Sequence, residues 1–197
     1  MPPISYDQFL TASTLALQRG AGASASAVHR DWVKQFIPST VNKLAEQVAE
    51  DPAKRPLLLK EVEVAITRKD NGVWEGAVNT DAYRQILLSA LRHASCFDKN
   101  AVIEENNQVL ELLYKEDWRQ VANTARYLNP AYAYYSLRGP TLLARPSAAM
   151  GDFSGTLLLH VPAIPDFNTV PLPYELVDDA QMILWDLAGK FLTAKAK

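Results

Sequence analysis

Hydrophobic and polar positions alternate with a helical period near the start of the chain. Ser5 and Gln8 form a capping box just before the first apolar positions, which predicts a helix over Tyr6–Gln18. The small residues Gly20–Ser26 follow, and such a tract is typical of a flexible connection. We therefore expect residues 1–26 to be a hinged N-terminal helical arm.

Two longer helices are predicted by the same spacing. Apolar residues recur from Trp32 to Val48, where Pro38 is expected to kink or divide the helix. After Pro173, a final helix is predicted from Tyr174 to Ala194, with apolar residues along one face.

Between these helices the period changes to two. Residues 58–66 alternate between apolar and polar, and Lys69–Gly72 supplies a turn before Val73-Trp74, which predicts a β-hairpin. Seven of the twelve prolines fall between Pro130 and Pro173, among short apolar runs that favour short strands joined by stiff turns. These runs are Tyr132–Leu137, Thr141–Ala144 and Thr156–Val161.

Two segments are ambiguous or weakly marked. Residues Asp81–Phe97 suit either a helix or a buried strand, and we favour the helix. Asn106 or Asn107 would cap a further short helix that extends toward Trp118. The predicted fold class is α+β: a helical bundle with a long C-terminal helix, a projecting β-hairpin and a small antiparallel sheet, forming a single domain over residues 1–197.

Composition agrees with an ordinary soluble globular domain. Of 197 residues, 48% are hydrophobic and 21% charged, and the net charge of −2 argues against a protein that wraps nucleic acid electrostatically. Cys96 is the one cysteine, so no internal disulfide is expected. The start lacks the pattern of a signal peptide, and no run of about 18 apolar residues predicts a membrane span.

The sequence does not predict an enzyme. His29, His93 and His160 are scattered and belong to no metal-binding pattern, and no Walker loop or GxGxxG motif occurs. The acidic residues at the start of the last helix are explained by the helix dipole. No catalytic, cofactor-binding or metal-binding residue is therefore predicted.

One charged region stands out. Between Trp118 and Gly151 there are arginines but no acid, and tyrosines lie among them. This composition is typical of a protein–protein interface, although it also occurs in proteins that bind single-stranded nucleic acid. The candidate interface residues here are Arg126, Tyr132, Tyr134 and Arg138.

The last helix carries a second candidate interface. Trp185 falls about 140° from the centre of the apolar face, on the side shared with Tyr174. Leu192 joins this side. A large apolar side chain in this position is either covered by the rest of the chain or used to contact a partner.

The order of motifs in the second half resembles the head-to-tail adaptor (connector, neck or collar) proteins of tailed bacteriophages. A strand pair over residues 132–146 leads to a strand over Gly155–Val161 and then to the link Pro162-Ala163-Ile164-Pro165. Leu172-Pro173 then opens a long terminal helix whose first turns are acidic.

The resemblance implies a structural virion protein with no reaction and no cofactor. Such adaptors form a ring, usually dodecameric, beneath the portal protein, and they contact tail nozzle, tube or fibre proteins. DNA passes through the lumen without sequence-specific binding, and no membrane is involved. The protein would be made in the host bacterial cytoplasm and reside at the head–tail junction of the virion. The alternative is a small bacterial cytoplasmic regulator that binds a protein or nucleic acid, and an enzyme ranks third.

Overall fold

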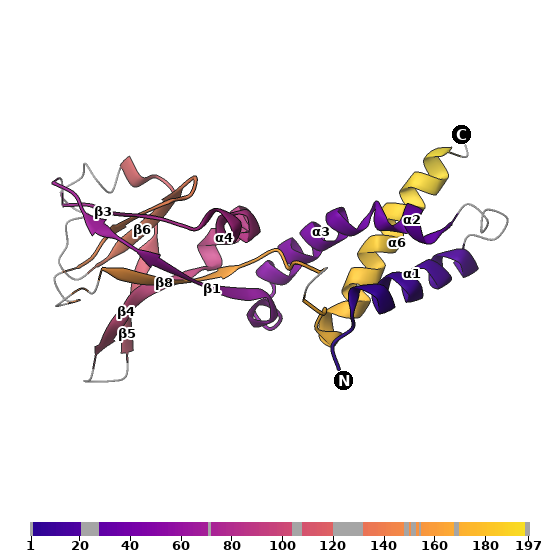
Figure 1. Cartoon of the computed structure of the whole chain (residues 1–197), viewed down its shortest axis with the longest axis horizontal. Helices are drawn as coiled ribbons and strands as arrows, with labels where there is room; N and C mark the ends of the chain where they lie inside the picture. Colours follow the sequence, from indigo (N-terminus) through magenta and orange to yellow (C-terminus); the bar gives the residue numbers. More distant parts are fainter. Residues whose placement is uncertain are drawn as a thin grey trace. The chain divides into compact units, whose positions relative to one another are not determined.

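A computed structural model describes residues 2–20, 28–70, 72–103, 108–119, 132–147, 150, 153, 155–167 and 170–195. The chain divides into two compact units where the sequence predicts one domain. Met1–Leu58 and Ile164–Lys197 form what we call the helical unit, and Leu59–Ala163 form the barrel unit. Figure 1 labels the elements of both. The barrel unit is thus inserted into the sequence of the helical unit.

The helical unit contains most of the predicted helices. Ser5 caps the first helix as expected, since the Gln8 amide donates to Ser5 Oγ at 3.3 Å and the Ser5 amide donates to Gln8 Oε1 at 3.0 Å. Pro38 lies in the first turn of a helix, where its missing N–H costs nothing, and the predicted division is confirmed. The elements are α1 (Tyr6–Gly20), α2 (Arg30–Lys34), α3 (Ile37–Glu50), η2 (Arg55–Leu58), η6 (Tyr174–Leu176) and α6 (Val177–Lys195).

The core of this unit lies where α1 and α3 pack against α6. Phe9 and Leu10 of α1, Leu44 of α3 and Leu184 of α6 are almost fully buried. Burial of each such side chain away from water stabilises the folded state by about 2 kcal/mol. The helix of the predicted arm is therefore part of this core, whereas the expected hinge at 21–26 lies outside the described residues.

Within the described residues, the barrel unit is built from eight strands and two short helices. The strand order is β1-β8-β4-β5-β6-β7-β3-β2, in which β5 and β6 pair in parallel and the other neighbours are antiparallel. The elements are β1 (Leu59–Ala65), β2 (Thr67–Arg68), β3 (Trp74–Ala77), α4 (Thr80–Gln85), η3 (Leu88–His93), β4 (Ser95–Ile103), β5 (Gln108–Tyr114), β6 (Tyr134–Arg138), β7 (Thr141–Arg145) and β8 (Thr156–Pro162).

The first and last strands of this order are consecutive in sequence. Only Ile66 separates β1 from β2, and its amide donates to the Gly155 carbonyl at 2.7 Å. One run of chain therefore pairs with β8 along its first part and with β3 along its second, which nearly closes the sheet into a barrel.

Closure brings β3 very close to β1, and Gly76 makes this approach possible. A Cβ at position 76 would lie 2.3 Å from the Ala65 carbonyl oxygen and 2.5 Å from Ile66 Cγ2. A side chain cannot be accommodated at such distances, so glycine is required at this crossing.

The predicted fold class is wrong. The sheet is a large, nearly closed, mixed sheet of eight strands instead of a small antiparallel one with a projecting hairpin. Within residues 58–66, Leu59–Ala65 do form a strand, but all seven of its residues pair with β8, and only two pairs join β2 to β3. The alternating pattern identifies a strand without identifying its partner.

Of two further helices predicted in this region, one is confirmed in part and the other is wrong. Residues Asp81–Phe97 form α4, η3 and the start of β4, and Gln108–Tyr114 form β5. Asn106 and Asn107 lie outside the described residues. Both segments carry apolar runs that suit a helix or a buried strand. Pairing in the sheet made Gln108–Tyr114 a strand, whereas the first segment is helical over Thr80–Gln85 and Leu88–His93 and joins the sheet at Ser95. The short strands predicted after Pro130 and the final helix are confirmed.

Candidate assembly surface

The outward face of α6 exposes large apolar side chains. Ile183, Leu184 and Ala188 face the core and are buried, whereas Met182 is 63% exposed and Trp185 is 40% exposed. Because each residue advances 100° around a helix, Met182 and Trp185 lie together on the side opposite the core. We call Asp178, Met182, Trp185 and Gly189 the α6 seam.

The residues of the α6 seam follow the spacing i, i+4, i+7, i+11, which is the spacing of a helix that packs along another helix. A Cβ at Gly189 would meet no atom within 4 Å, so packing inside the chain does not require glycine there. On the flank of the seam, Lys190 Nζ contacts Asp186 Oδ2 at 2.6 Å. The α6 seam therefore carries the large apolar side chains of Met182 and Trp185, with the charged Asp178 at one end and a charged pair on its flank.

Met182 was not among the predicted interface residues. Its phase on the helix could have revealed it, since it lies on the same side as Trp185. Of the other predicted residues of this surface, Tyr174 lies in η6 and is 42% exposed, and Leu192 lies in α6 with its side chain outside the described part.

The predicted Arg/Tyr surface does not form a continuous platform within the described residues. Tyr132 is 52% exposed and Arg138 at the end of β6 is also exposed, but Arg126 lies outside the described residues. Tyr134 is only 7% exposed and packs in a small cluster with Val73, Trp118 and Leu143.

The two tyrosines of β6, Tyr134 and Tyr135, are both buried inside the barrel unit. Lys115 Nζ lies 5.7 Å from the centre of the Tyr134 ring. Tyr135 is fully buried, its hydroxyl donates to the Ala94 carbonyl at 3.4 Å, and burial raises its pKa. Buried rings cannot stack on the bases of a single-stranded nucleic acid, so this pattern does not favour the regulator alternative.

The three histidines have local structural roles. His29 caps α2 by accepting from the Trp32 amide at 3.2 Å, and His93 lies beside Arg92 with 3.2 Å between Nε2 and Arg92 Nε. His160 lies 2.8 Å from Glu61 Oε2. In the described ranges, no three His, Cys, Asp or Glu residues are placed to hold a metal ion.

Cys96 lies in the barrel core. Burial raises the pKa of its thiol, and the charge of Glu111 adds to this effect. A thiol in this environment remains protonated and unreactive at neutral pH.

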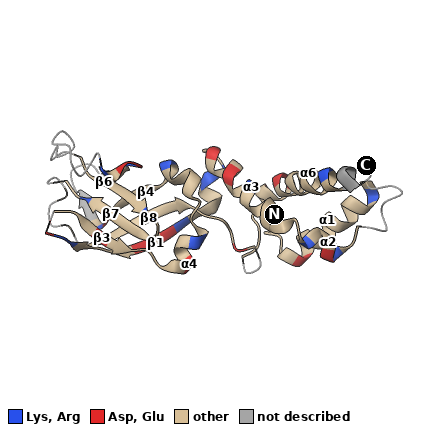
Figure 2. Cartoon of the chain, turned by 90° about the horizontal axis from the view of Figure 1, so that it is seen from above, with Lys and Arg blue, Asp and Glu red and all other residues tan. Residues whose placement is uncertain are grey.

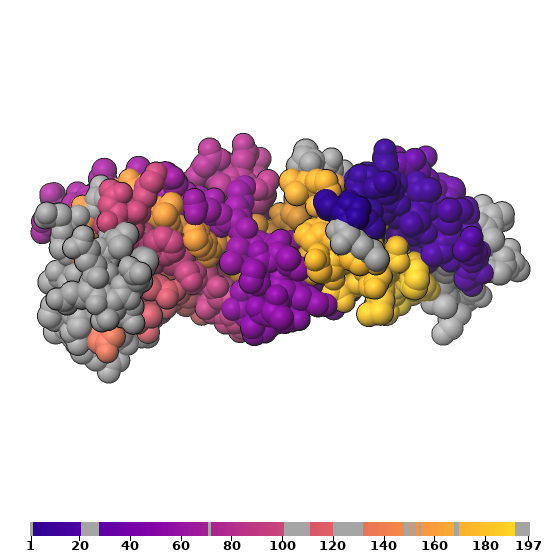
Figure 3. Space-filling view, turned by 90° about the horizontal axis from the view of Figure 1, so that it is seen from below, coloured from indigo at the N-terminus to yellow at the C-terminus, as the bar shows by residue number. Residues whose placement is uncertain are grey.

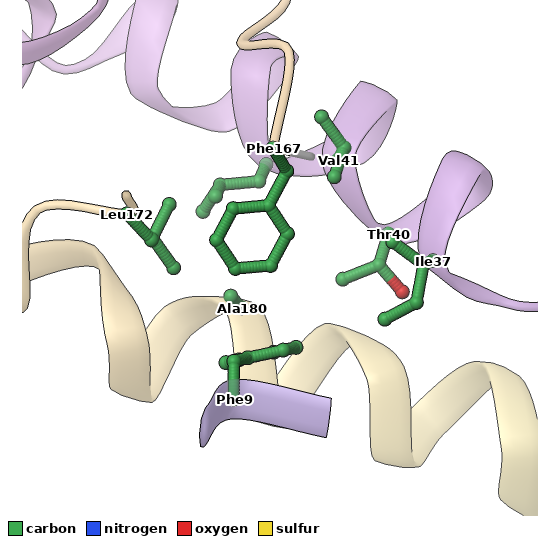
Figure 4. Close-up of a pocket in the computed structure, with 8 residues that line it drawn as sticks. Phe9, Ile37, Thr40, Val41, Phe167, Leu172 and Ala180 are labelled. Carbon is green, nitrogen blue, oxygen red and sulfur yellow. The ribbon is translucent and has the colours of Figure 1, made fainter. Parts of the chain in front are cut away.

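A cavity in the core of the helical unit is too small for an organic ligand. Its volume is about 10 Å³. Figure 4 shows the Phe167 ring at its centre, with Ala180 and the Phe9 ring below it. Phe167 meets the Phe9 ring edge-on, with 5.2 Å between the ring centres. The cavity is a packing void of the core. It is lined by Phe9, Ile37, Thr40, Val41, Leu44, Phe167, Leu172 and Ala180.

Charge is spread over both units. Figure 2 shows segments of acidic and basic residues along the ribbon of each unit. None of the described helices is long and apolar enough to cross a membrane. No protein-family model, no curated protein and no solved structure matches the chain. The α6 seam is therefore assessed on its own geometry.

Proposed function

We propose that this chain is a structural virion protein that forms a ring beneath the portal and joins the DNA-filled head to the tail of a tailed bacteriophage. It acts at the head–tail junction after synthesis in the host cytoplasm. Its partners are other copies of itself, the portal protein and tail proteins. The observation that carries the proposal is the exposure of Met182 and Trp185 on the outward face of α6.

Exposure of these side chains favours assembly for an energetic reason. Each is a large apolar group that gains about 2 kcal/mol when fully buried, and tryptophan is enriched at the centres of interfaces. One helix seam buries less area than a stable dimer needs. A ring suits such a contact because every copy makes two contacts and closure joins them all.

The charge of the chain is compatible with a channel for DNA. Its net charge is −2, whereas a strongly basic wall would hold DNA through phosphate contacts and slow its passage. This role requires no reactive group, and the buried Cys96 thiol and the locally paired histidines are not needed for it.

Mass photometry and negative-stain imaging test the proposal. The full chain is measured alone and mixed with the portal protein of the same genome, as the wild type and as Trp185→Glu, which places a charge in the α6 seam. We expect rings for the wild type on the portal and few or none for Trp185→Glu. Leu88→Glu, which places the same charge at an exposed leucine of η3 in the barrel unit, is the matched control and should form rings normally. A wild-type chain that stays monomeric and ignores the portal overturns the proposal.

A further inference from the structure

The outward face of α1 matches the α6 seam in spacing. The opposite side of α1 faces the core, and its buried residues are Phe9, Leu10, Ser13 and Thr14. On the outward side, Leu15 is 49% exposed, and Ala12 and Arg19 are exposed as well. We call Ala12, Leu15 and Arg19 the α1 seam; they follow the spacing i, i+3, i+7, as do Met182, Trp185 and Gly189.

The two seams fit in one register when the helices run in parallel. The long Met182 side chain then meets the small Ala12, and the two most bulky side chains, Trp185 and Leu15, meet one turn further on. The facing pairs are Met182 with Ala12, Trp185 with Leu15, and Gly189 with Arg19.

Charge complements shape at the third pair. Gly189 leaves open space for the long Arg19 side chain, and the Asp186 carboxylate lies on the flank beside it. Within the described residues, Arg19 forms no ion pair. Asp186 already contacts Lys190, and both of these side chains are exposed enough to admit a second cation.

One chain cannot join its own two seams. Helices α1 and α6 contact each other through their buried faces, so the seams on the opposite sides point away from each other. Figure 3 shows the surfaces of α1, in indigo, and α6, in yellow, side by side. A second copy can supply the missing seam, and a contact between two unlike surfaces repeats from copy to copy.

We propose that α6 of one copy packs in parallel against α1 of the next copy, through the α6 seam and the α1 seam. This inference rests on the proposed ring. In the helical unit, α1 and α6 run toward the same end (Figure 1), so a parallel contact keeps successive copies in similar orientations. A ring of many copies requires this, because neighbours differ only by a small rotation.

Disulfide trapping tests the contact directly. The variant Leu15→Cys/Trp185→Cys is oxidised mildly on the portal, and covalent products are resolved by denaturing electrophoresis. We expect a ladder of multimers. Neither single variant should cross-link, and an equal mixture of the two single variants should give dimers only. Native Cys96 is buried and protonated, so it does not contribute.

The control carries the same number of exposed thiols. Leu15→Cys/Leu88→Cys places the second thiol on η3 of the barrel unit and should give no ladder. Charge reversal provides an independent readout: Arg19→Glu should slow trapping about fivefold, and adding Asp186→Arg should restore the rate.

Each outcome separates this inference from the proposed function. Dimers from Trp185→Cys alone would show that α6 packs on itself, which overturns the inference. Rings in images without a Leu15→Cys/Trp185→Cys ladder also overturn it, while the ring survives. Neither rings nor trapping in the presence of portal protein would overturn both.

Discussion

The substitution Gly76→Ala should destabilise the barrel unit strongly, because Gly76 lies where the barrel closes. Its new methyl group would stand 2.3 Å from the Ala65 carbonyl oxygen, whereas real Cβ contacts are essentially never shorter than 3.0 Å. Two further contacts, with Ile66 Cγ2 at 2.5 Å and Val64 Cγ1 at 2.9 Å, are also too short. Strands β1 and β3 would have to separate.

The expected cost follows from the kind of atom that is approached. Overpacking a core usually costs about 1–3 kcal/mol, when side chains can adjust. Here the shortest contact is with backbone, which cannot rotate away. We therefore expect the free energy of unfolding of the barrel unit to fall by about 3 kcal/mol, a large share of the roughly 5–15 kcal/mol that stabilises a typical domain.

Urea denaturation measures this loss. Replacing Trp32 and Trp185 by Phe leaves only Trp74 and Trp118, so that tryptophan fluorescence reports the barrel unit alone. Gly189→Ala is the matched control: its methyl group enters open space in α6 of the helical unit, so the fluorescence transition of the barrel unit should not shift. If Gly76→Ala unfolds within about 0.5 kcal/mol of the parent, the closure argument is refuted.

Three further predictions concern single groups and the division of the chain. Ser13→Ala should raise the stability of the helical unit by about 1 kcal/mol in urea denaturation, because the buried Ser13 hydroxyl has no hydrogen-bond partner among the described residues; a loss of stability would contradict this. Burial raises the pKa of Cys96, so the unfolded chain loses this proton first as pH rises; stability should fall by about 1.4 kcal/mol per pH unit above roughly pH 9, and this slope should decrease in Cys96→Ala. A fragment of residues 59–163 should fold alone, because Leu59 pairs with Pro162; a featureless amide NMR spectrum would exclude it.

The helices at the two ends of the helical unit were predictable because their signals are local. The capping box at Ser5 and Gln8 starts α1 through contacts three residues apart, and the apolar face of α6 repeats along the helix itself. Long-range packing agrees with these local preferences, so the expected ranges were confirmed within a few residues.

The barrel was not predictable for the opposite reason. Leu59–Ala65 has the alternation of a strand, but its main partner, β8, begins at Thr156. Gly76 carries no local sign that a carbonyl will approach it, since only the closed sheet brings Ala65 there. Gln108–Tyr114 became a strand because it pairs with β4 and β6, which no local pattern encodes.

The residues of the candidate surface were also predictable only in part. The sequence by itself determined that Trp185 lies off the apolar face of its helix, because helical phase depends only on residue number. The tertiary structure alone decided that Tyr134, from a similar pattern, is buried, and that Leu15 of α1 remains exposed. Exposure depends on which distant segments cover a side chain, and those contacts are established only when the whole chain packs.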